Sequence, residues 1–174
     1  MTMSSICARS RWGSVALATL ALVFGAARAE AACTASAANR AAFGSVTSFD
    51  AGGTSQQTST IDAGLTCTGA FLAILRVNDF IDATITSTAG GLRGPTGDLI
   101  PYTLYADSTT TYPIALGTPF NYHTGTLLDI LGLLSGGTHD LPMFIRTTPG
   151  ANVAAGTYTD TLSVAWHWDY CDGV

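Results

Sequence analysis

The stretch GTYTDTLSVAWHWDYC, residues 156–171, alternates apolar and polar side chains over most of its length. Successive side chains of a β-strand point to opposite faces of the sheet, so this stretch has one apolar and one polar face. The apolar parity holds Tyr158, Leu162, Val164, Trp166, Trp168 and Tyr170, with Asp160 as its polar exception. We expect a strand at residues 157–170 whose apolar face packs into a core, where each tryptophan contributes a few kcal/mol.

Short segments of similar character recur along the chain, separated by turns rich in Gly and Pro. The further strands predicted from them are 41–49, 58–67, 71–79, 83–87, 99–107, 141–148 and two short ones within 111–126. For the continuous apolar run 71–79, one or two helical turns are the alternative. Pro101 places the 99–107 strand at a sheet edge or at its own beginning. About eight short strands are typical of a sandwich. We therefore predict an all-β fold, an immunoglobulin-like antiparallel β-sandwich.

The N-terminal segment has the composition of a secretory signal peptide. Arg9 and Arg11 precede the apolar stretch 13–27, which is too short to cross a bilayer comfortably. Small residues near position 29 suit cleavage by a signal peptidase, whereas a short membrane anchor is the alternative. We expect residues 1–29 to be a signal peptide and residues 30–174 to be one exported domain without a membrane span.

The charge of that predicted domain excludes one class of partner. From Glu30 onward the chain has four arginines and no lysine against eleven aspartates and Glu30, which gives a net charge of −8. A protein that binds nucleic acid needs a cationic surface, and binding to an anionic membrane needs one too. We expect neither nucleic acid nor membrane lipid as a partner.

No motif assembles a catalytic, cofactor or metal site. The histidines, at 123, 139 and 167, lack the spacing of a zinc site, and the glycines at 90–97 lack the Lys and following helix of a phosphate loop. No GxSxG elbow or EF-hand loop is present. The sequence predicts a protein that is not an enzyme and has no cofactor; a small secreted hydrolase stays as an unfavoured alternative.

Two further features leave alternatives open. Cys33, Cys67 and Cys171 follow the predicted signal peptide, and an odd number leaves one thiol outside any single internal bridge. The segment 127–134 spaces apolar residues as a helix does. It either caps the core or forms an exposed apolar patch. The residues of that candidate patch are Leu127, Leu128, Ile130, Leu131, Leu133 and Leu134.

The order of several short motifs resembles a known family. FGSV (43–46) and GLTCTG (64–69) are followed by an Arg-bearing glycine-rich stretch, LIPYTLYAD (99–107) and GTYTDTLSV (156–164). This order resembles the spore coat protein U domain family, which includes subunits and tip adhesins of archaic, Csu-type chaperone–usher pili. The likeness covers nearly all of the predicted exported chain.

The resemblance implies a sandwich that lacks one strand. A periplasmic chaperone lends a strand, and the N-terminal extension of a neighbouring pilin replaces it at the outer-membrane usher, by strand addition to an open edge. The family's N-terminal cysteine pair corresponds to Cys33 and Cys67. Closing that loop would stabilise the domain by about 3.8 kcal/mol in the chain-entropy model.

The resemblance also suggests a position within the pilus. Only about three residues lie between the predicted cleavage site and Cys33, which is too short for a donor strand. We therefore expect a tip adhesin, or its N-terminal binding domain, that attaches to an abiotic or host surface and supports biofilm formation. Cys171 would then be unpaired or pair outside this domain. The alternative is a polymerising pilus shaft or spore-coat-like structural subunit.

Overall fold

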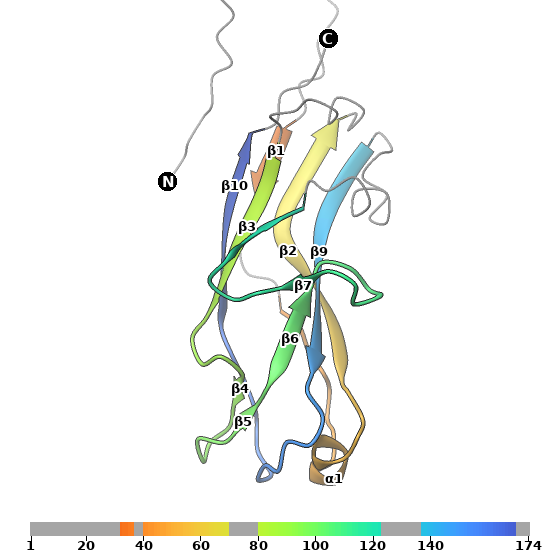
Figure 1. The fold of residues 1–174 in the computed structure, drawn as a ribbon, viewed down its shortest axis with the longest axis vertical. Helices are drawn as coiled ribbons and strands as arrows, with labels where there is room; N and C mark the ends of the chain where they lie inside the picture. Colours follow the sequence, from red (N-terminus) through yellow and green to blue (C-terminus); the bar gives the residue numbers. More distant parts are fainter. Residues whose placement is uncertain (1–31, 37–39, 70–79, 123–136, 170–174) are drawn as a thin grey trace, which may run out of the picture.

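Two antiparallel sheets face one another in the computed structural model, which describes residues 32–36, 40–69, 80–122 and 137–169 (Figure 1). The larger sheet has the strand order β1-β2-β9-β6-β7 and the smaller one β10-β3-β8. The larger contains β1 (Ala32–Ala35), β2 (Thr58–Gly69), β9 (Gly137–Thr147), β6 (Tyr102–Tyr105) and β7 (Pro113–Ile114). The smaller contains β10 (Leu162–Asp169), β3 (Phe80–Ser87) and β8 (Pro119–Asn121). The predicted all-β antiparallel sandwich is confirmed.

Two small elements lie at the lower end in Figure 1. The strands β4 (Leu92–Arg93) and β5 (Leu99–Ile100) form a hairpin, and α1 (Ser48–Gly52) is a single helical turn. Thr47 caps this helix, since its Oγ1 accepts a hydrogen bond of 3.1 Å from the backbone N–H of Asp50.

The strand β10 has the alternation that its sequence predicts. It pairs with β3 from Leu162 opposite Ser87 to Asp169 opposite Phe80. Leu162, Val164, Trp166 and Trp168 are half-buried and pack against the core, whereas the residues between them are exposed. The regular strand begins only at Leu162, so residues 157–161 precede it. The apolar face of β10 is therefore directed inward but is not fully covered by the described residues.

The core lies between the two sheets and draws on both. Leu65 of β2, Ile85 of β3 and Leu141 of β9 are fully buried. The other buried core residues are Ala63, Cys67, Ile81, Ala83, Leu104, Ala106, Ile114, Tyr122, Met143 and Ile145. Inward side chains from both sheets thus share one apolar layer, as a β-sandwich requires.

An irregularity interrupts the pairing of β2 with β9. Asp62 lies opposite Pro142 and Thr66 opposite Asp140, so residues 63–65 of β2 face a single residue of β9. Gly64 has a φ of +81°, a conformation that costs other L-residues energy. This β-bulge leaves the backbone of Ala63 outside the β2–β9 ladder, which is why its carbonyl is available to another partner.

The prediction of a strand at 41–49 was wrong. Residues 40–47 form no strand, and residues 48–52 form α1. Ala41 and Phe43 do pack against the core, so the alternation indicated burial correctly, but no described strand pairs with this segment. The short strand β1 was not expected at all. Pro101, which has no N–H to donate, divides the predicted 99–107 strand into β5 and β6. The predicted strand 71–79 lies outside the described residues.

Candidate functional site

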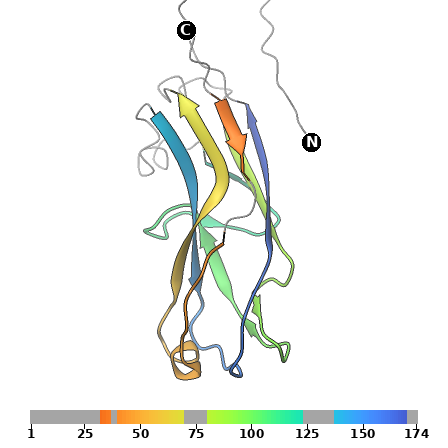
Figure 2. The same ribbon diagram turned by 180° about the vertical axis from the view of Figure 1, so that it is seen from behind.

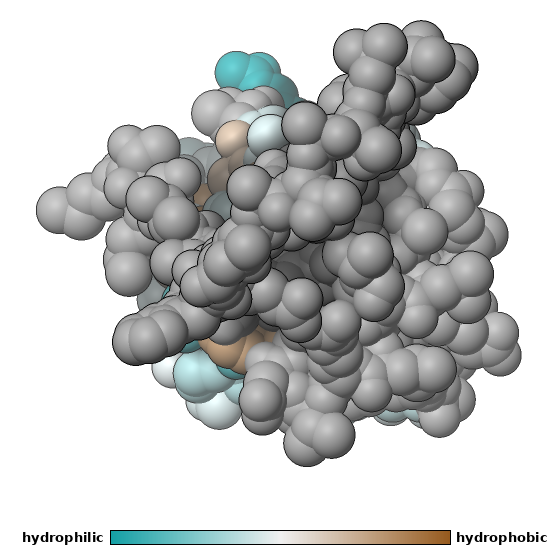
Figure 3. All heavy atoms as spheres, turned by 90° about the horizontal axis from the view of Figure 1, so that it is seen from above, coloured by the Kyte–Doolittle hydropathy of each residue, from teal (hydrophilic) through white to brown (hydrophobic). Residues whose placement is uncertain are grey.

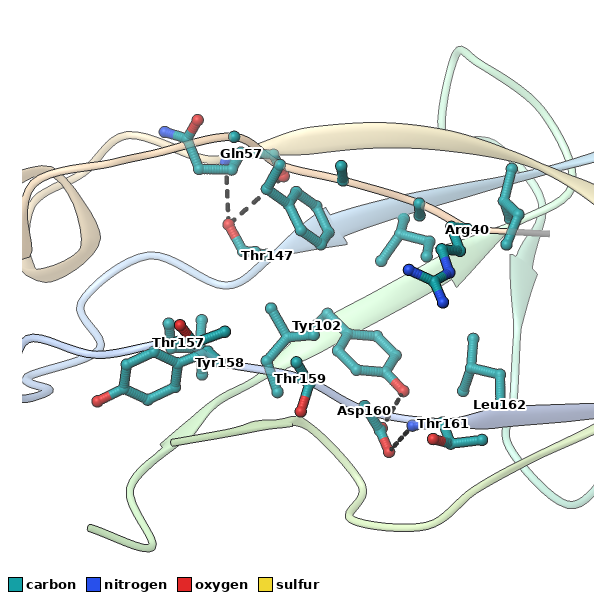
Figure 4. Close-up of a pocket in the computed structure, with 18 of the residues that line it drawn as sticks. Arg40, Gln57, Tyr102, Thr147, Thr157, Tyr158, Thr159, Asp160, Thr161 and Leu162 are labelled. Atoms are coloured by element: carbon teal, nitrogen blue, oxygen red, sulfur yellow. Dashed lines mark hydrogen bonds between the residues drawn. The ribbon is translucent and has the colours of Figure 1, made fainter. Parts of the chain in front are cut away.

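A long groove runs along the open side of the sandwich, between β10 and an N-terminal segment. This segment, residues 40–47, is called the arm here; it runs between β2 and β10 towards α1 (Figure 2). The groove has a volume of about 1370 Å³. Its lining includes Leu162, Val164 and Trp166 of β10, Met143 and Ile145 of β9, and Arg40, Ala41 and Phe43 of the arm. Figure 4 shows side chains from both sides directed into this space.

One edge of β10 borders the groove. β10 is the first strand of its sheet and pairs with β3 along one edge. No described strand pairs with its other edge. The backbone N–H and C=O groups of such an edge are a template for another strand. A site that accepts a strand needs two features, which are an unpaired sheet edge and apolar side chains beside it that can contact the incoming strand.

The arm forms the opposite wall of the groove with few hydrogen bonds of its own. Ser59 Oγ of β2 donates a hydrogen bond of 3.0 Å to the Ala42 carbonyl. Ala41 and Phe43 face the core while Ala42 is exposed, so the arm is extended although unpaired. On each side of the groove there is therefore a backbone segment that pairs with no described strand.

A hydrogen bond crosses between the sheets within the groove. The indole Nε1–H of Trp166 donates to the Ala63 carbonyl at 3.0 Å. This carbonyl is the one that the bulge in β2 releases from the β2–β9 ladder. Trp166 thereby ties β10 to the larger sheet while its ring lies 5.4 Å from that of Tyr122, measured between centroids.

A second hydrogen bond joins the sheets where β10 begins. Tyr102 Oη donates to Asp160 Oδ2 at 2.6 Å (Figure 4). Asp160 also accepts hydrogen bonds from Ser87 Oγ at 2.5 Å and Thr88 Oγ1 at 2.8 Å. The backbone N–H groups of Ala89 and Thr161 donate to the same carboxylate. Five donors thus converge on one side chain.

This network shifts the pKa values of both partners. Burial tends to raise the pKa of the Asp160 carboxyl, but the hydrogen bonds to its charged form outweigh burial and hold it below the ordinary value. Burial, together with the hydrogen bond to Asp160, raises the pKa of Tyr102 to about 12. Asp160 is therefore a structural anion and Tyr102 a neutral donor at physiological pH.

The glycine-rich loop meets the turn before β10 below the groove. A Cβ on Gly94 would lie 2.3 Å from Cε1 of Tyr158, and a Cβ on Gly156 would lie 2.8 Å from Cδ of Pro95. Tyr158 Oη donates to the Ala154 carbonyl at 2.7 Å. These close approaches explain why glycine is needed at both positions.

The described residues offer little for chemistry other than binding. They contain no group of three or more His, Cys, Asp or Glu side chains placed to hold a metal ion. His167 is exposed, with its ring 4.8 Å from that of Phe80. Within the described ranges no helix is long and apolar enough to cross a bilayer. The groove is therefore the candidate site.

The structure describes some, but not all, of the residues singled out in the sequence. Cys33 and Cys67 lie opposite one another in β1 and β2 and form a disulfide, the pair that the resemblance implied. Cys171 and the patch residues Leu127, Leu128, Ile130, Leu131, Leu133 and Leu134 lie outside the described residues. In the view onto the end where β3 and β9 begin, the described residues show as small, separate apolar and polar areas (Figure 3).

One signal in the sequence points to this site. Asp160 is the polar exception on an apolar face, and a carboxylate in that position must find hydrogen-bond donors inside the fold. Its donor Tyr102 lies 58 residues away, so the pair could not be inferred from spacing. Phe49 of α1 was also missed; its side chain is 87% exposed.

Comparisons with known proteins identify a family and a similar solved structure. The family model of the Spore Coat Protein U domain matches residues 17–165. The chain is also similar to a chain of the crystal structure of the CsuC–CsuE chaperone–tip adhesion subunit pre-assembly complex from archaic chaperone–usher Csu pili of Acinetobacter baumannii. That match has 25% sequence identity and a TM-score of 0.54, and it covers 79% of this chain but only 46% of the other. No curated protein sequence matches significantly.

Proposed function

This chain belongs to the Spore Coat Protein U domain family, and from that premise we propose that it is a non-enzymatic subunit of a chaperone–usher pilus. The observation that carries the proposal is the groove between the arm and the free edge of β10. A segment of another protein can pair with this edge and place every second side chain against Leu162, Val164 and Trp166. Filling the groove completes the sandwich.

The partners follow from the same proposal. A periplasmic pilus chaperone supplies the first strand, and a neighbouring pilin supplies the second at the outer-membrane usher. The similarity to a chaperone–subunit pre-assembly complex supports the chaperone and the pilin. Residues 1–29 act as the signal peptide, and residues 30–174 form the exported domain, which passes through the periplasm to the pilus on the cell surface.

We place the chain at the tip of the pilus, as an adhesin or as its N-terminal binding domain. Its structural relative contains a tip adhesion subunit, and this chain spans 46% of the matched chain. Cleavage near residue 29 leaves few residues ahead of Cys33. Mass spectrometry of the exported protein tests this position, since an N-terminus well upstream of residue 29 would instead favour a polymerising shaft subunit.

Attachment to an abiotic or host surface is the most specific part of the proposal. The apolar residues at 127–134 are one candidate contact, and Phe49 of α1 is another because most of its side chain reaches water. We expect Phe49→Ser or the double change Leu131→Ser and Leu134→Ser to reduce retention of the purified chain on polystyrene beads. Equal retention of wild type and both variants would exclude these residues as the contact.

The groove itself is tested with two neighbouring substitutions in β10. Val164 lines the groove and is half-buried, whereas Ala165 is exposed. A carboxylate at 164 would be buried by an incoming strand without a partner, so Val164→Asp should lower the amount of chain in pili sheared from cells. Ala165→Asp should not. The purified variants are compared by thermal unfolding to show that both remain folded.

If Val164→Asp assembled as well as Ala165→Asp, the groove would not be the site of assembly. Loss of assembly in both variants would also contradict the proposal, because exposed Ala165 does not line the groove.

A further inference from the structure

The groove contains one cationic side chain among apolar neighbours. Arg40, at the start of the arm, lines the groove and is exposed. Figure 4 shows its guanidinium directed from the arm into the groove, on the side where Tyr102 and Leu162 lie. Among the described residues no carboxylate forms an ion pair with Arg40. A guanidinium in such a position is a ready partner for a planar anion.

The acidic groups that line the same groove are already engaged. The Asp160 carboxylate accepts five hydrogen bonds, from the hydroxyls and N–H groups described above. Asp62 Oδ1 accepts a hydrogen bond of 2.8 Å from the Gly64 N–H within the bulge. Both carboxylates thus have structural roles, whereas Arg40 has none in the described structure.

The positive charge of Arg40 also stands out because the chain as a whole is acidic. The chain from Glu30 onward carries a net charge of −8. An acidic segment is repelled by the acidic parts of this surface, so the arginine that lines the groove favours a negative charge there.

We propose that the strand which fills this groove carries an acidic side chain that pairs with Arg40. This inference rests on the proposed function, in which the groove accepts a strand from another protein. The occupant is therefore an extended segment with alternating apolar side chains and one Asp or Glu placed opposite Arg40. A strand inserted in the wrong register or direction would lose this pair, so Arg40 selects among strands of equal apolarity.

The effect is expected to be moderate in size. Exposed ion pairs contribute little, and a pair at the edge of a filled groove is only partly desolvated. We expect the matching acidic residue to strengthen binding about five- to tenfold at low salt and less at high salt.

The test uses synthetic peptides of 11 residues that alternate Val and Thr, with blocked ends. One series carries a single Glu at each position in turn, a second series a single Lys, and the parent has neither. Binding to the exported chain is followed through the fluorescence of Trp166, which lines the groove. A change of Trp166 to Phe identifies the signal as that of this residue.

Two variants of equal net charge complete the design. Arg40→Glu reverses the groove charge, and Arg93→Glu reverses an exposed arginine that does not line this groove. We expect one Glu position to bind best to wild type and to Arg93→Glu. In Arg40→Glu that preference should disappear, and Lys at the same position should restore tight binding.

Two results would overturn the inference in distinguishable ways. If the parent binds but no Glu position improves on it, or if the two variants behave alike, Arg40 does not select the strand and the proposed groove function stands. If no peptide of any charge binds, the groove does not accept a strand, and the proposed function falls together with this inference.

Discussion

Tyr102 and Asp160, 58 positions apart in the chain, are joined by a hydrogen bond of 2.6 Å that links the larger sheet to the residue preceding β10. Each belongs to one of the two motifs that most closely resemble the family, LIPYTLYAD and GTYTDTLSV. Tyr158 of the second motif packs on Gly94 of the glycine-rich loop. Residues of the two motifs and of the glycine-rich loop therefore meet in space and hold the start of β10 in place.

Removing either partner of this hydrogen bond should destabilise the fold. Tyr102→Phe removes one donor, and Asp160→Asn removes the charge and half of the acceptor capacity, so we expect losses of about 1 and about 2–3 kcal/mol in unfolding free energy. In urea unfolding of both single variants and the double variant, the two losses should not add, with a coupling of about 1 kcal/mol. Strict additivity of the two losses would show that the hydrogen bond between these side chains does not contribute to stability.

Stability should fall at both extremes of pH. Hydrogen bonds hold the pKa values of Asp107 and Asp160 below their ordinary range against the effect of burial. The folded state therefore binds fewer protons than the unfolded state near pH 4, so stability is complete above about pH 5 and declines as the pH falls through 4.

At alkaline pH the dependence of stability on pH has the opposite sign, so the alkaline limb of the stability curve falls as the pH rises. Burial raises the pKa of Tyr102 to about 12 and also raises that of Tyr122. The folded chain keeps protons that the unfolded chain releases near pH 10, so stability should be lost between about pH 10 and 12. Thermal unfolding across the pH range measures both limbs. Asp160→Asn should flatten the acid limb and Tyr102→Phe the alkaline one; unchanged slopes would contradict the assignment.

The hydrogen bond from Trp166 to Ala63 gives a third prediction. Trp166→Phe keeps most of the ring but leaves the Ala63 carbonyl without this donor, which should cost about 1–3 kcal/mol. Trp168→Phe is the matched control, because Trp168 is also half-buried in β10 but its indole N–H makes no cross-sheet hydrogen bond to another described residue. Chemical denaturation should show the larger loss for residue 166. Equal losses would mean that only ring volume matters.

The bulge in β2 should not tolerate a side chain at Gly64. A Cβ there would lie 3.0 Å from the Ser36 carbonyl oxygen, and the φ of +81° disfavours alanine in addition. We expect Gly64→Ala to cost about 2 kcal/mol or more. Gly97→Ala is the control, since Gly97 has a φ of +90° and no atom near the new Cβ. It should cost about 1 kcal/mol. A smaller loss at 64 than at 97 would contradict the close approach.

The disulfide closes a separation of 34 residues and should stabilise the domain. In a background where Cys171 is Ser, the double change Cys33→Ser and Cys67→Ser should lower the unfolding free energy by about 2–4 kcal/mol. Dithiothreitol should destabilise the background protein to a similar extent and leave the double variant unchanged. Insensitivity of the background protein to the reductant would contradict a bridge between these cysteines.

The sequence was a good guide wherever alternation of side chains decides the structure. In β10, four half-buried apolar residues alternate with exposed ones, as the pattern from Leu162 to Trp168 predicts. The pattern failed for 41–49, because alternation reports which side chains are buried and not whether a backbone finds a strand to pair with. Phe43 is packed against the core there, yet its segment remains unpaired among the described residues.

The site was less accessible to sequence reasoning than the fold. The groove lies between the arm and β10, which are more than a hundred residues apart, so no local pattern contains both walls. The strand β1 was missed for a similar reason: its four residues show no periodicity, and its place is set by pairing with β2 beside Cys67. Long-range partners determine both features.

The bulge in β2 also limits how this chain can vary in length. Residues 63–65 occupy the place of one residue in β9, so β2 has two residues more than β9 between the paired ends of the ladder. Ile61, Ala63, Leu65 and Cys67 therefore remain on the same side. Deleting a single residue would turn Leu65 and Cys67 towards solvent and break the disulfide. Deleting two would turn them inward again but remove the free carbonyl that Trp166 uses, so the bulge fixes the length of this strand.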